Sequence, residues 1–530
     1  MDDGPSGEGG SVRVAELAAS LSLATDLGMG FPWEQGLQAT MAAMRLCDLL
    51  DADLETRRQT YYMTLLFYSG CTSDAAEDAH IIGGAKTANI VPFIWGTLPD
   101  RLRGLLRALP QPDAPPPVAL RQRLVGVPRA ALVLPEHQRG YCDVGQALAT
   151  RLGLGSSLAQ SFRFLTDRWD GAGVLRRAKG EAIPPAVRIA TVARDASFLH
   201  VVWSSEKARE AMRSRAGKAH DPAVVAAFLR NADDVLAGDG ASRWADVMAA
   251  EPPPHTGLRP SQLDTALAAM GDFADLISPS LSGHSSGVSM LSGRAAEVLG
   301  MDEPSVSTVR RAALLQDIGR VGVDARIWEK AAPLTPDEWE QVRLHPYYSE
   351  RVLSRSSLLA GLAEPGACHH ERLDGSGYHR GLPAAMLSAP ARVLAAADEF
   401  RSVTQPRPYR PALSRSRAAR LLTEEANAGR LDVDAVEAVL HVAGELTSPL
   451  ARPRGLTHRE TQVLGLLARG LTTRQVARSL GVAVKTADRH VQNAYRKIGV
   501  SSRAGAALFA MEHGLVAWGE LPIGERSTAP

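Results

Sequence analysis

Six histidine and aspartate side chains between residues 280 and 400 have the chemistry of metal ligands. They are His284, Asp317, His345, His369, His370 and Asp398. Borderline first-row divalent cations favour a mixed set of imidazoles and carboxylates. A single histidine is more often a satisfied core or surface residue, but a set of this size at these intervals predicts a metal-binding site.

The residues around these candidates indicate the elements that position them. The stretch HSSGVSML predicts a helix that begins at His284, and LLQDIGR predicts a helix that carries Asp317. Two adjacent histidines cannot face the same way on a regular helix, so His369 and His370 fit a helix end or two neighbouring metal ions. The three glycines of DGSGYHRG indicate a tight loop close to the site.

The order and spacing of these residues resemble the HD-GYP family of all-helical metal phosphohydrolases, which hydrolyse cyclic dinucleotides. The resemblance covers about residues 262–445 and is carried by RLHPYYSERVL, CHHERLDGSGY and ADEFRSVTQPRPYRPALS. It implies bound divalent metal, Fe or Mn, with a bridging hydroxide that attacks phosphorus. By this resemblance one ion is held by Asp317, His345, His369 and His370. A depleted second site is left to His284 and Asp398.

The chain departs from the HD-GYP pattern at four positions. Gln316 stands where the family has the histidine of its His-Asp pair, and Arg320 stands where it has a lysine that steadies the phosphate. His379 replaces the proline of the Gly-Tyr-Pro motif, and Ser280 occupies a place where some members have a glutamate ligand. Loss of part of a two-metal clamp removes stabilisation of the attacking and leaving oxygens. Arg320 can still bind phosphate through its planar fork, so the site is expected to serve binding better than turnover.

Two long segments of the chain repeat each other. RWDGAG (168–173) and RLDGSG (372–377) lie 204 residues apart, and residues 47–70 match residues 296–319 in length and apolar pattern at an offset of 249. HDPAVVAAFL and LDVDAVEAVL predict a similar closing helix in each segment. Helices rich in alanine and leucine align easily, but three matching blocks in the same order favour duplication.

The first repeat has none of the candidate ligands. At these offsets His284, Gln316, Asp317 and Arg320 fall on Gln35, Phe67, Tyr68 and Cys71. His345, His369, His370 and Asp398 fall on Tyr141, Leu165, Thr166 and Arg194. The first repeat therefore resembles a degenerate HD-GYP-like domain, in which aromatic and aliphatic side chains fill the former metal cavity or line an apolar pocket. Ligand sensing and a packing role in a dimer both fit this pattern.

The C-terminal segment carries concentrated positive charge. Residues 455–515 hold nine Lys or Arg against three Asp or Glu, a net charge of +6 in a chain whose total is +1. Thr457 with Glu460, and Thr472 with Gln475, fit capping boxes that begin two helices. A glycine-containing turn then precedes VKTADRHVQNAYRKIG. A short helix, a turn and a basic second helix predict a helix-turn-helix unit.

This segment closely resembles the LuxR/GerE-type DNA-binding domain over its whole length. The resemblance implies four helices, of which the third enters the major groove of double-stranded DNA. On that helix Arg489 and Gln492 are the candidates for contact with base edges. The remaining DNA-contact candidates, most of them suited to phosphates, are Arg474, Lys485, Thr486 and Arg496.

Two positions, one just before the third helix and one in its first turn, differ from the LuxR pattern. The family usually has Ser or Thr where Ala483 stands, and Ala487 is smaller than the usual valine. Loss of a capping side chain costs about 1 kcal/mol. We therefore expect a recognition helix of reduced stability, tightened by DNA or by a partner domain.

Length and composition predict a multidomain globular protein. At 530 residues the chain is too long for one core, and 45% hydrophobic with 22% charged residues argues against extensive disorder. The four cysteines are scattered without a CxxC pair, which favours reduced thiols in a cytoplasmic protein. The acidic start lacks a signal-peptide pattern, and no apolar run approaches the roughly 20 residues that cross a bilayer, so no membrane contact is expected.

The expected fold is all-α, with two tandem helical HD-GYP-like domains in front of a four-helix LuxR-type domain. Proline-rich stretches indicate the boundaries. The predicted parts are a flexible tail (1–14), the degenerate repeat (15–247), a linker (248–261), the second repeat (262–446), a second linker (447–454), the DNA-binding domain (455–517) and a tail (518–530).

These patterns predict a cytoplasmic, homodimeric transcription regulator. Its HD-GYP-like modules are expected to sense a metal, a cyclic dinucleotide or another small ligand, and to control DNA binding by the C-terminal domain. Two alternatives stay open. One is a metal-dependent cyclic-dinucleotide phosphodiesterase with an attached DNA-binding domain, in which residual hydrolysis survives the change at Gln316. The other is a purely structural front half that dimerises the regulator.

Overall fold

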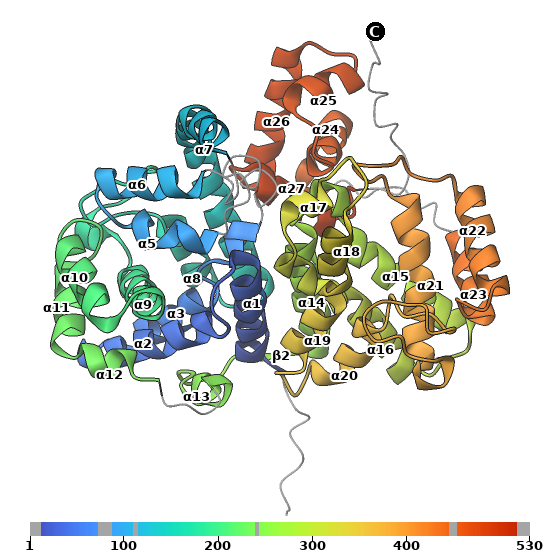
Figure 1. The fold of residues 1–530 in the computed structure, drawn as a ribbon, viewed down its shortest axis with the longest axis horizontal. Coiled ribbons are helices and arrows are strands. Elements are labelled where there is room, and N and C mark those ends of the chain that lie inside the picture. Colours follow the sequence, from blue (N-terminus) through green and yellow to red (C-terminus); the bar gives the residue numbers. More distant parts are fainter. Residues whose placement is uncertain (1–11, 73–86, 110–114, 239–242, 445–452, 517–530) are drawn as a thin grey trace, which may run out of the picture.

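The computed structural model describes residues 12–72, 87–109, 115–238, 243–444 and 453–516. Helices make up most of this part of the chain, and its two short strands, β1 (Val12–Arg13) and β2 (Gly257–Leu258), pair antiparallel. Figure 1 shows two helical bodies side by side, with the C-terminal helices above their junction. The predicted all-α class, with helical repeats followed by a four-helix domain, is confirmed.

The first body is built from the helices that precede β2. They are α1 (Val14–Met29), α2 (Gln35–Leu49), α3 (Leu54–Leu65), α5 (Val91–Ile94), α6 (Leu98–Ala108), α7 (Pro116–Arg151), α8 (Ser156–Ser161), α9 (Pro185–Val202), α10 (Ser205–Arg215), α11 (Pro222–Arg230), α12 (Ala232–Leu236) and α13 (Arg243–Ala249). Short 3-10 helices lie between them, at η1 (Ser69–Thr72), η2 (Thr87–Asn89), η3 (Phe162–Phe164) and η4 (Gly180–Ala182).

The second body follows the same plan. Its helices are α14 (Pro260–Asp275), α15 (His284–Val298), α16 (Glu303–Leu315), α17 (Ala325–Trp328), α18 (Pro336–Arg343), α19 (His345–Leu353), α20 (Ala360–Ala367), α21 (Ala389–Thr404), α22 (Arg415–Asn427) and α23 (Val433–Ala443). Its 3-10 helices are η5 (Pro279–Leu281), η6 (Ile318–Gly322) and η7 (Ala384–Met386).

Equivalent elements of the two bodies begin at the predicted offsets. Helices α3 and α16 start at the larger offset, and each is capped by an aspartate that accepts a backbone N–H of the first turn, Asp53 or Asp302. Helices α9 and α21 start at the smaller offset, as do η4 and η7. These paired starts agree with the predicted duplication.

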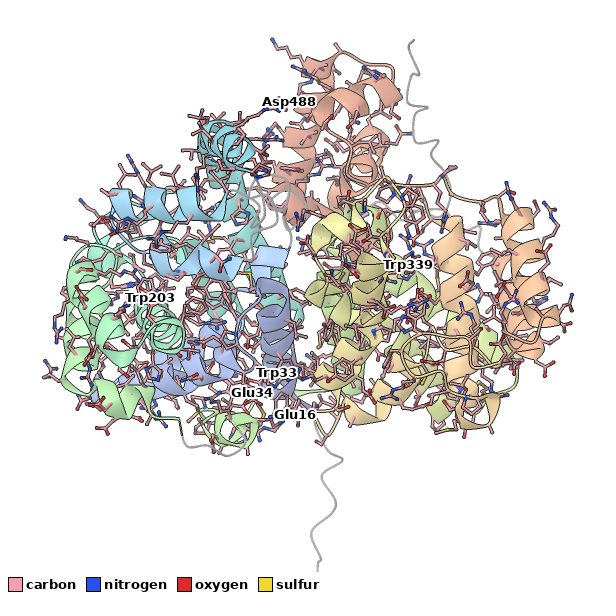
Figure 2. The ribbon with its side chains drawn as sticks, in the orientation of Figure 1. Glu16, Trp33, Glu34, Trp203, Trp339 and Asp488 are labelled. Atoms are coloured by element: carbon pink, nitrogen blue, oxygen red, sulfur yellow. The ribbon has the colours of Figure 1, made fainter. Side chains whose placement is uncertain are left out.

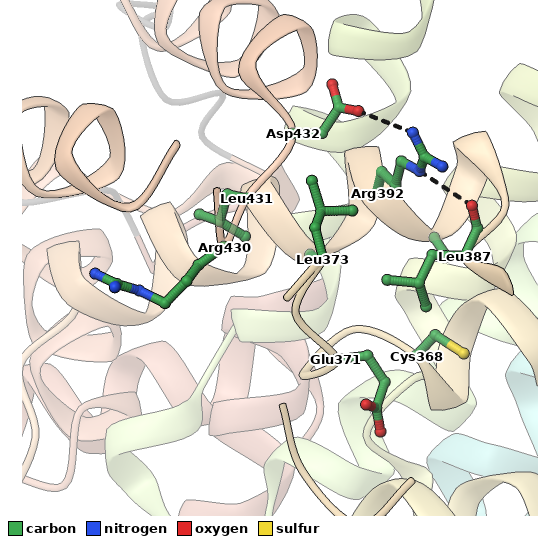
Figure 3. Close-up of a pocket in the computed structure, with 10 residues that line it drawn as sticks. Cys368, Glu371, Leu373, Leu387, Arg392, Arg430, Leu431 and Asp432 are labelled. Carbon is green, nitrogen blue, oxygen red and sulfur yellow. Dashed lines mark hydrogen bonds and ion pairs between the residues drawn. The ribbon is translucent and has the colours of Figure 1, made fainter. Parts of the chain in front are cut away.

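Equivalent contacts also recur in the two bodies. Asp26 Oδ2 accepts the N–H of Gly36 at 3.0 Å, and at the larger offset Asp275 Oδ2 accepts the N–H of Ser285 at 3.0 Å. Burial raises the pKa of both carboxyl groups to about 7. The closing helices are tied in the same way, by the ion pairs Arg188–Asp221 (2.7 Å) and Arg392–Asp432 (3.2 Å; Figure 3).

Two glycines allow an equally close approach in each body. A Cβ added to Gly70 would lie 2.2 Å from the carbonyl oxygen of Tyr141, and one added to Gly319 would lie 2.2 Å from that of His345. No side chain fits at such a distance, so only glycine permits these elements to touch. The contact also places Tyr141 in the position that His345 occupies in the second body.

The segment between the two bodies is packed. Residues 248–261, predicted as a linker, contain β2 and the buried Glu251, whose carboxylate accepts hydrogen bonds from Arg13 (3.0 Å) and Tyr62 (2.6 Å). Residues 12 and 13 of the predicted tail form β1, and residues 1–11 lie outside the described residues. The partners of Glu251 lie about 190 to 240 residues away in the sequence, so the residues next to Glu251 could not indicate that this segment is packed.

The two bodies share an interface through α1. Helix α1 contacts η6 and α19, and a Cβ on Gly28 would lie 3.0 Å from the carbonyl oxygen of Val321. The guanidinium of Arg351 lies 4.1 Å above the ring of Trp33, which is labelled at the junction in Figure 2. The first body therefore packs directly on the 3-10 helix that follows Asp317.

The C-terminal domain consists of α24 (His458–Ala468), α25 (Thr473–Ser479), α26 (Val484–Ile498) and α27 (Arg503–Glu512), after the short η8 (Pro453–Gly455). Both predicted capping boxes, at Thr457 and Thr472, are present. Ala483 precedes α26 without a side-chain cap, as predicted. Helix α27 is buried because it packs on α24 and also on α7 and α14 of the two repeats. Among the described residues, no helix has the length and apolarity to cross a membrane.

Candidate functional site

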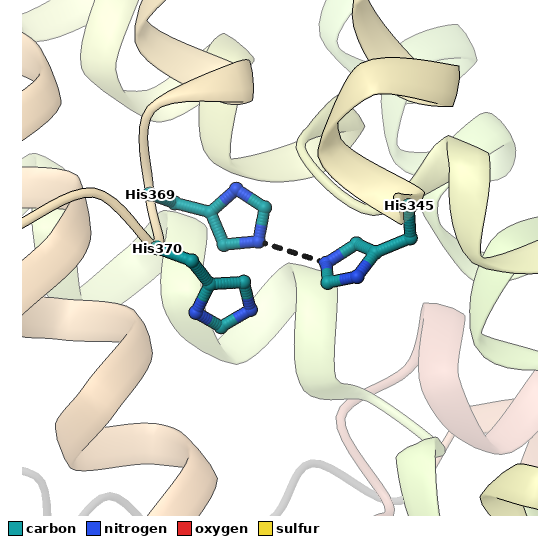
Figure 4. Close-up of side chains that lie close together, drawn as sticks. All are labelled: His345, His369 and His370. Carbon is teal, nitrogen blue, oxygen red and sulfur yellow. Dashed lines mark hydrogen bonds between the residues drawn. The ribbon is translucent and has the colours of Figure 1, made fainter. Parts of the chain in front are cut away.

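Three histidines of the second repeat converge at the ends of two helices (Figure 4). His345 is the first residue of α19, while His369 and His370 follow the end of α20, as the paired histidines predicted. The Nε2 atoms of His345 and His369 lie 3.2 Å apart. Their Nδ1 atoms point the other way and donate to the carbonyl oxygens of Val342 (2.6 Å) and Gly366 (2.5 Å). This backbone bonding leaves the Nε2 lone pairs facing one another.

A second group lies next to the histidines. His284 Nε2 is 2.9 Å from Asp398 Oδ1 and 3.4 Å from Asp317 Oδ2. The other oxygen of Asp317 is 3.2 Å from His345 Nε2 and 3.4 Å from His369 Nε2. Asp317 therefore lies between both groups, and the structure brings all six predicted ligand residues together.

Burial and neighbouring charge set the protonation of this cluster. Burial would raise the pKa of Asp317, but the charge of the Arg320 guanidinium and a hydrogen bond from His284 hold it well below its usual range. Burial lowers the pKa of His345 to about 4 and lowers that of His370 well below its ordinary value. At neutral pH His345 and His370 are therefore neutral beside the Asp317 carboxylate, the protonation states in which these groups bind a cation. His284 differs, because its hydrogen bonds with Asp317 and Asp398 outweigh burial and raise its pKa above the ordinary value.

The donor set fits a divalent metal in two triads. One is His345, His369 and His370, and the other is His284, Asp317 and Asp398. Lone pairs that face each other at 3.2 Å repel unless a cation or a proton lies between them, and the lowered pKa of His345 disfavours the proton. Asp398 Oδ2 is also buried without a hydrogen-bond partner among the described residues. A bound metal would act as a Lewis acid toward a phosphoryl oxygen.

Gln316 occupies part of the second triad's coordination space. The sequence predicted that the helix through LLQDIGR carries Asp317, but α16 ends at Leu315, so Gln316 lies at its C-terminus and Asp317 directly precedes the 3-10 helix η6. Gln316 Nε2 donates to Asp317 Oδ2 (3.1 Å) and to Asp398 Oδ1 (3.0 Å). The amide thus bridges two carboxylates that a cation would otherwise bridge.

Arg320 turns inward. Its Nε lies 2.9 Å from Asp317 Oδ1, its Nη2 lies 3.5 Å from His284 Nε2, and the side chain is 4% exposed. The sequence predicted a phosphate contact for this residue. In the structure its charge is directed at Asp317, with the ring of Trp328 at 5.6 Å from the guanidinium carbon.

The other two departures from the HD-GYP pattern, His379 and Ser280, lie outside the ligand cluster. The ring of His379 lies 6.1 Å from that of Tyr347, and its two nitrogens have no hydrogen-bond partner in the described part of the chain. Ser280 shares a 2.8 Å hydrogen bond with Ser278, on η5. Neither residue is a member of the two triads.

Two supporting residues were missed at the sequence level. Gln405 Oε1 lies 2.7 Å from His284 Nδ1 and so orients that ring. Glu371 accepts the backbone N–H groups of Arg380 (3.2 Å) and Leu382 (3.1 Å), which fixes the glycine-containing loop. Glu371 lies in CHHERLDGSGY and Gln405 in ADEFRSVTQPRPYRPALS. A polar residue close to a candidate ligand was the only signal in the sequence that could have indicated either of them.

The corresponding space in the first repeat is not simply apolar. The rings of Phe67, Tyr68 and Tyr141 are buried there, as the aromatic substitutions predicted. Arg194, however, is also buried, at 1% exposure, with its guanidinium carbon 4.9 Å from the ring of Tyr68. The expectation of an aromatic and aliphatic cavity is wrong in this respect, because a full positive charge remains inside it.

The predicted DNA-contact residues lie on one accessible part of the C-terminal domain. Arg489, Gln492 and the other candidates on α26 follow its outer face, where Ala487 and Val491 turn toward the domain core. All the candidates are exposed except Thr486, which is half-buried. Arg474 lies on α25, the helix before the turn. The arrangement suits a helix whose polar face enters the major groove.

Comparison with known proteins gives two family matches. Residues 269–435 match the HD domain family, and residues 454–510 match the luxR family of bacterial regulatory proteins.

Individual relatives are phosphodiesterases. The chain is 28% identical over 428 residues to 3'3'-cGAMP-specific phosphodiesterase 3 of Vibrio cholerae, an alignment that covers 78% of this chain and 90% of the relative. It is 38% identical over 174 residues, 32% of this chain, to a cyclic di-GMP phosphodiesterase of Thermotoga maritima, and spans only 47% of that relative. A crystal structure of a cyclic GMP-AMP specific phosphodiesterase of V. cholerae shares the fold, with a TM-score of 0.56 and 24% identity over 83% of this chain and 99% of that one.

Proposed function

Because the chain joins an HD domain to a DNA-binding domain of the luxR family, we propose that it is a transcription regulator whose second repeat senses a metal-dependent phosphorylated ligand. One observation carries this proposal. The six candidate metal ligands lie together, but Gln316 and Arg320 both direct N–H groups at the carboxylate of Asp317. Binding groups are retained, while the space for a complete two-metal clamp is reduced.

The DNA-binding role rests on α26. Arg489 and Gln492 lie three residues apart, on neighbouring positions of one helical face, and both are exposed. Arginine reads guanine and glutamine reads adenine through paired hydrogen bonds in the major groove. We expect a purified full-length chain to protect a specific promoter site in a footprinting assay, and the double change of Arg489 and Gln492 to alanine to abolish that selectivity.

The ligand we propose for the second repeat is a cyclic dinucleotide. The Vibrio cholerae and Thermotoga relatives act on 3'3'-cGAMP and on cyclic di-GMP, and the six candidate ligands that this chain retains form two triads. The metal would be held by the His345, His369 and His370 triad with Asp317, and Fe and Mn both suit this set. Each dinucleotide is expected to change the affinity of the chain for its promoter when Mn²⁺ is present.

We further propose a homodimer, because a helix-turn-helix domain of this size reads two half-sites about 34 Å apart. The front half offers an apolar face for a second copy. Its exposed apolar residues on α6 and α7 are Leu98, Leu102, Leu106, Val118, Leu120, Leu124, Val125, Leu132 and Leu134. This half of α7 and the recognition helix α26 lie on the same, upper side of Figure 1. Sedimentation of the full chain, with Leu124→Glu and Leu132→Glu as the disrupting pair, tests the arrangement.

A second candidate function is hydrolysis of the same ligand. It is favoured by His345 and His369, whose Nδ1 atoms donate to backbone carbonyls so that their Nε2 atoms are free to bind metal, and by the long alignment with a cGAMP-specific phosphodiesterase. One experiment separates the two functions. Full-length protein with Mn²⁺ or Fe²⁺ is incubated with 3'3'-cGAMP, and promoter binding and linear product are both measured. Ligand-dependent DNA binding without product supports sensing, whereas product that disappears in a His369→Ala, His370→Ala variant supports the enzyme.

A further inference from the structure

Arg194 on α9 is buried without an ion-pair or hydrogen-bond partner in the described part of the chain. Its side chain is 1% exposed, and none of its three guanidinium nitrogens has a hydrogen-bond partner in the described part of the chain. The nearest aromatic contacts are the rings of Tyr68 and Phe67, 4.9 and 5.7 Å from the guanidinium carbon. Burial of an unpaired charge is among the most costly events in folding, so a native guanidinium in this state indicates a missing partner.

The guanidinium faces the start of a helix. A Cβ added to Gly36, in the first turn of α2, would lie 3.3 Å from Arg194 Nη1 and 1.9 Å from Ser22 Oγ. Arg194 and Ser22 therefore both lie against the N-terminal turn of this 15-residue helix, where backbone N–H groups create a positive end. The hydroxyls of Ser22 and Tyr68 are buried, and neither has a hydrogen-bond partner among the described residues.

Asp26 does not fully neutralise this group. One of its oxygens accepts the N–H of Gly36 at 3.0 Å, and the other has no partner in the described residues. No carboxylate of the described chain lies within 4.0 Å of the Arg194 nitrogens, the distance that defines an ion pair. Burial raises the pKa of Asp26 to about 7 although the charge of Arg194 opposes that rise, so this carboxyl carries only part of a negative charge at neutral pH.

We propose that the first repeat binds a small oxyanion of phosphate size between Arg194 and the N-terminus of α2. Arginine's planar fork matches the oxygens of phosphate, and helix N-termini favour anions. The hydroxyls of Ser22 and Tyr68 supply two further donors. All the named side chains are buried, which excludes a ligand as large as a dinucleotide from this position.

The proposed site inverts the chemistry of the second repeat. Arg194 stands at the offset position of the ligand Asp398, and Gln35 stands at that of His284. Where one repeat collects carboxylates and imidazoles around a cation, the other collects a guanidinium and hydroxyls around an anion. This inference does not depend on the function proposed for the second repeat.

Thermal unfolding of the full-length protein tests the proposal, with inorganic phosphate as the probe at constant ionic strength. The comparison is between the wild type, Arg194→Met and the matched change Arg168→Met, which removes another buried arginine of the first repeat, one that is bonded to Asp170. We expect millimolar phosphate to raise the melting temperature of the wild type and of Arg168→Met, and to leave Arg194→Met unchanged. Absence of any phosphate effect in the wild type, or an equal effect in Arg194→Met, overturns the proposal.

Two milder variants decide the matter if Arg194→Met does not fold. Ser22→Ala and Tyr68→Phe each delete one hydroxyl and keep the charge, so each should weaken phosphate binding about 5- to 10-fold in a titration, the ratio expected for one hydrogen bond. Phosphate affinity that is the same in both variants as in the wild type refutes the site.

Discussion

Replacement of Gln316 by histidine should have opposite effects on the stability of the metal-free protein and on its affinity for metal. In the wild type, Gln316 Nε2 bridges Asp317 Oδ2 and Asp398 Oδ1 at 3.1 and 3.0 Å. Hydrogen bonds to charged groups contribute about 1.5–3 kcal/mol each, and an imidazole can replace only one of the two. The metal-free Gln316→His protein should therefore be about 2 kcal/mol less stable than the wild type, a fall in melting temperature of roughly 4–8 °C for a domain of this size.

Metal should reverse this order. The new imidazole adds a ligand to the triad of His284, Asp317 and Asp398, and Mn²⁺ or Fe²⁺ should bind at least about tenfold more tightly, which corresponds to ~1.4 kcal/mol. A ligand that binds only the folded state stabilises it in proportion to the logarithm of its concentration over Kd. The variant should thus gain more from added metal than the wild type does.

The assay is calorimetry of the full-length chain in EDTA and in Mn²⁺, with metal content measured by elemental analysis. Gln316→Leu is the matched control, because it removes both hydrogen bonds and supplies no ligand. It should lose similar stability in EDTA and gain nothing further from metal. Equal responses of Gln316→His and Gln316→Leu to Mn²⁺, or no loss of stability of either variant in EDTA, would refute the proposed role of Gln316.

Three further predictions follow from the described contacts. Ala483→Ser should supply the missing cap of α26 and stabilise that helix by about 1 kcal/mol, seen as slower amide exchange in its first turn. Changing Arg489 or Gln492 to alanine should reduce discrimination between promoter and random DNA by about 1–3 kcal/mol each, measured by competition binding; loss of general affinity alone would contradict the assigned base contacts. Burial raises the pKa of Asp26 and of Asp275 to about 7, above the usual 3.8, so the folded state retains two protons that the unfolded state releases. Stability should fall as pH rises from about 4 to 7, and changing both residues to asparagine should flatten the melting temperature over that window.

Much of the fold and the ligand cluster could be predicted because their signals are local or periodic. The capping boxes at Thr457 and Thr472 and the helix start at His284 each depend on residues within one turn. The convergence of the six ligands followed from motif order. The sequence could not predict where the side chains of Arg320 and Gln316 point. In the structure Arg320 faces Asp317, and Gln316 bridges two carboxylates that lie far apart in the sequence.

The duplication shows the same limit. The two offsets between the repeats placed Arg194 at the position of a metal ligand, but substitution patterns alone suggested a filled apolar cavity. Whether a buried arginine finds a carboxylate depends on rotamers and on residues from several helices. Pairing of Arg13 with Glu251, which are distant in the sequence, was hidden for the same reason.

The attachment of α27 limits how the DNA-binding domain can move. Helix α27 lies within the main apolar core of the repeats, and Ser282, two residues before the candidate ligand His284, donates a hydrogen bond to the carbonyl oxygen of Ala468 at 2.7 Å. Detaching the domain would bare Leu508, Phe509 and Met511 to water, which opposes release. A DNA-binding domain that tumbles independently of the repeats is therefore ruled out for this conformation. Any reorientation toward DNA has to displace the loop that carries His284, or find new apolar cover for α27.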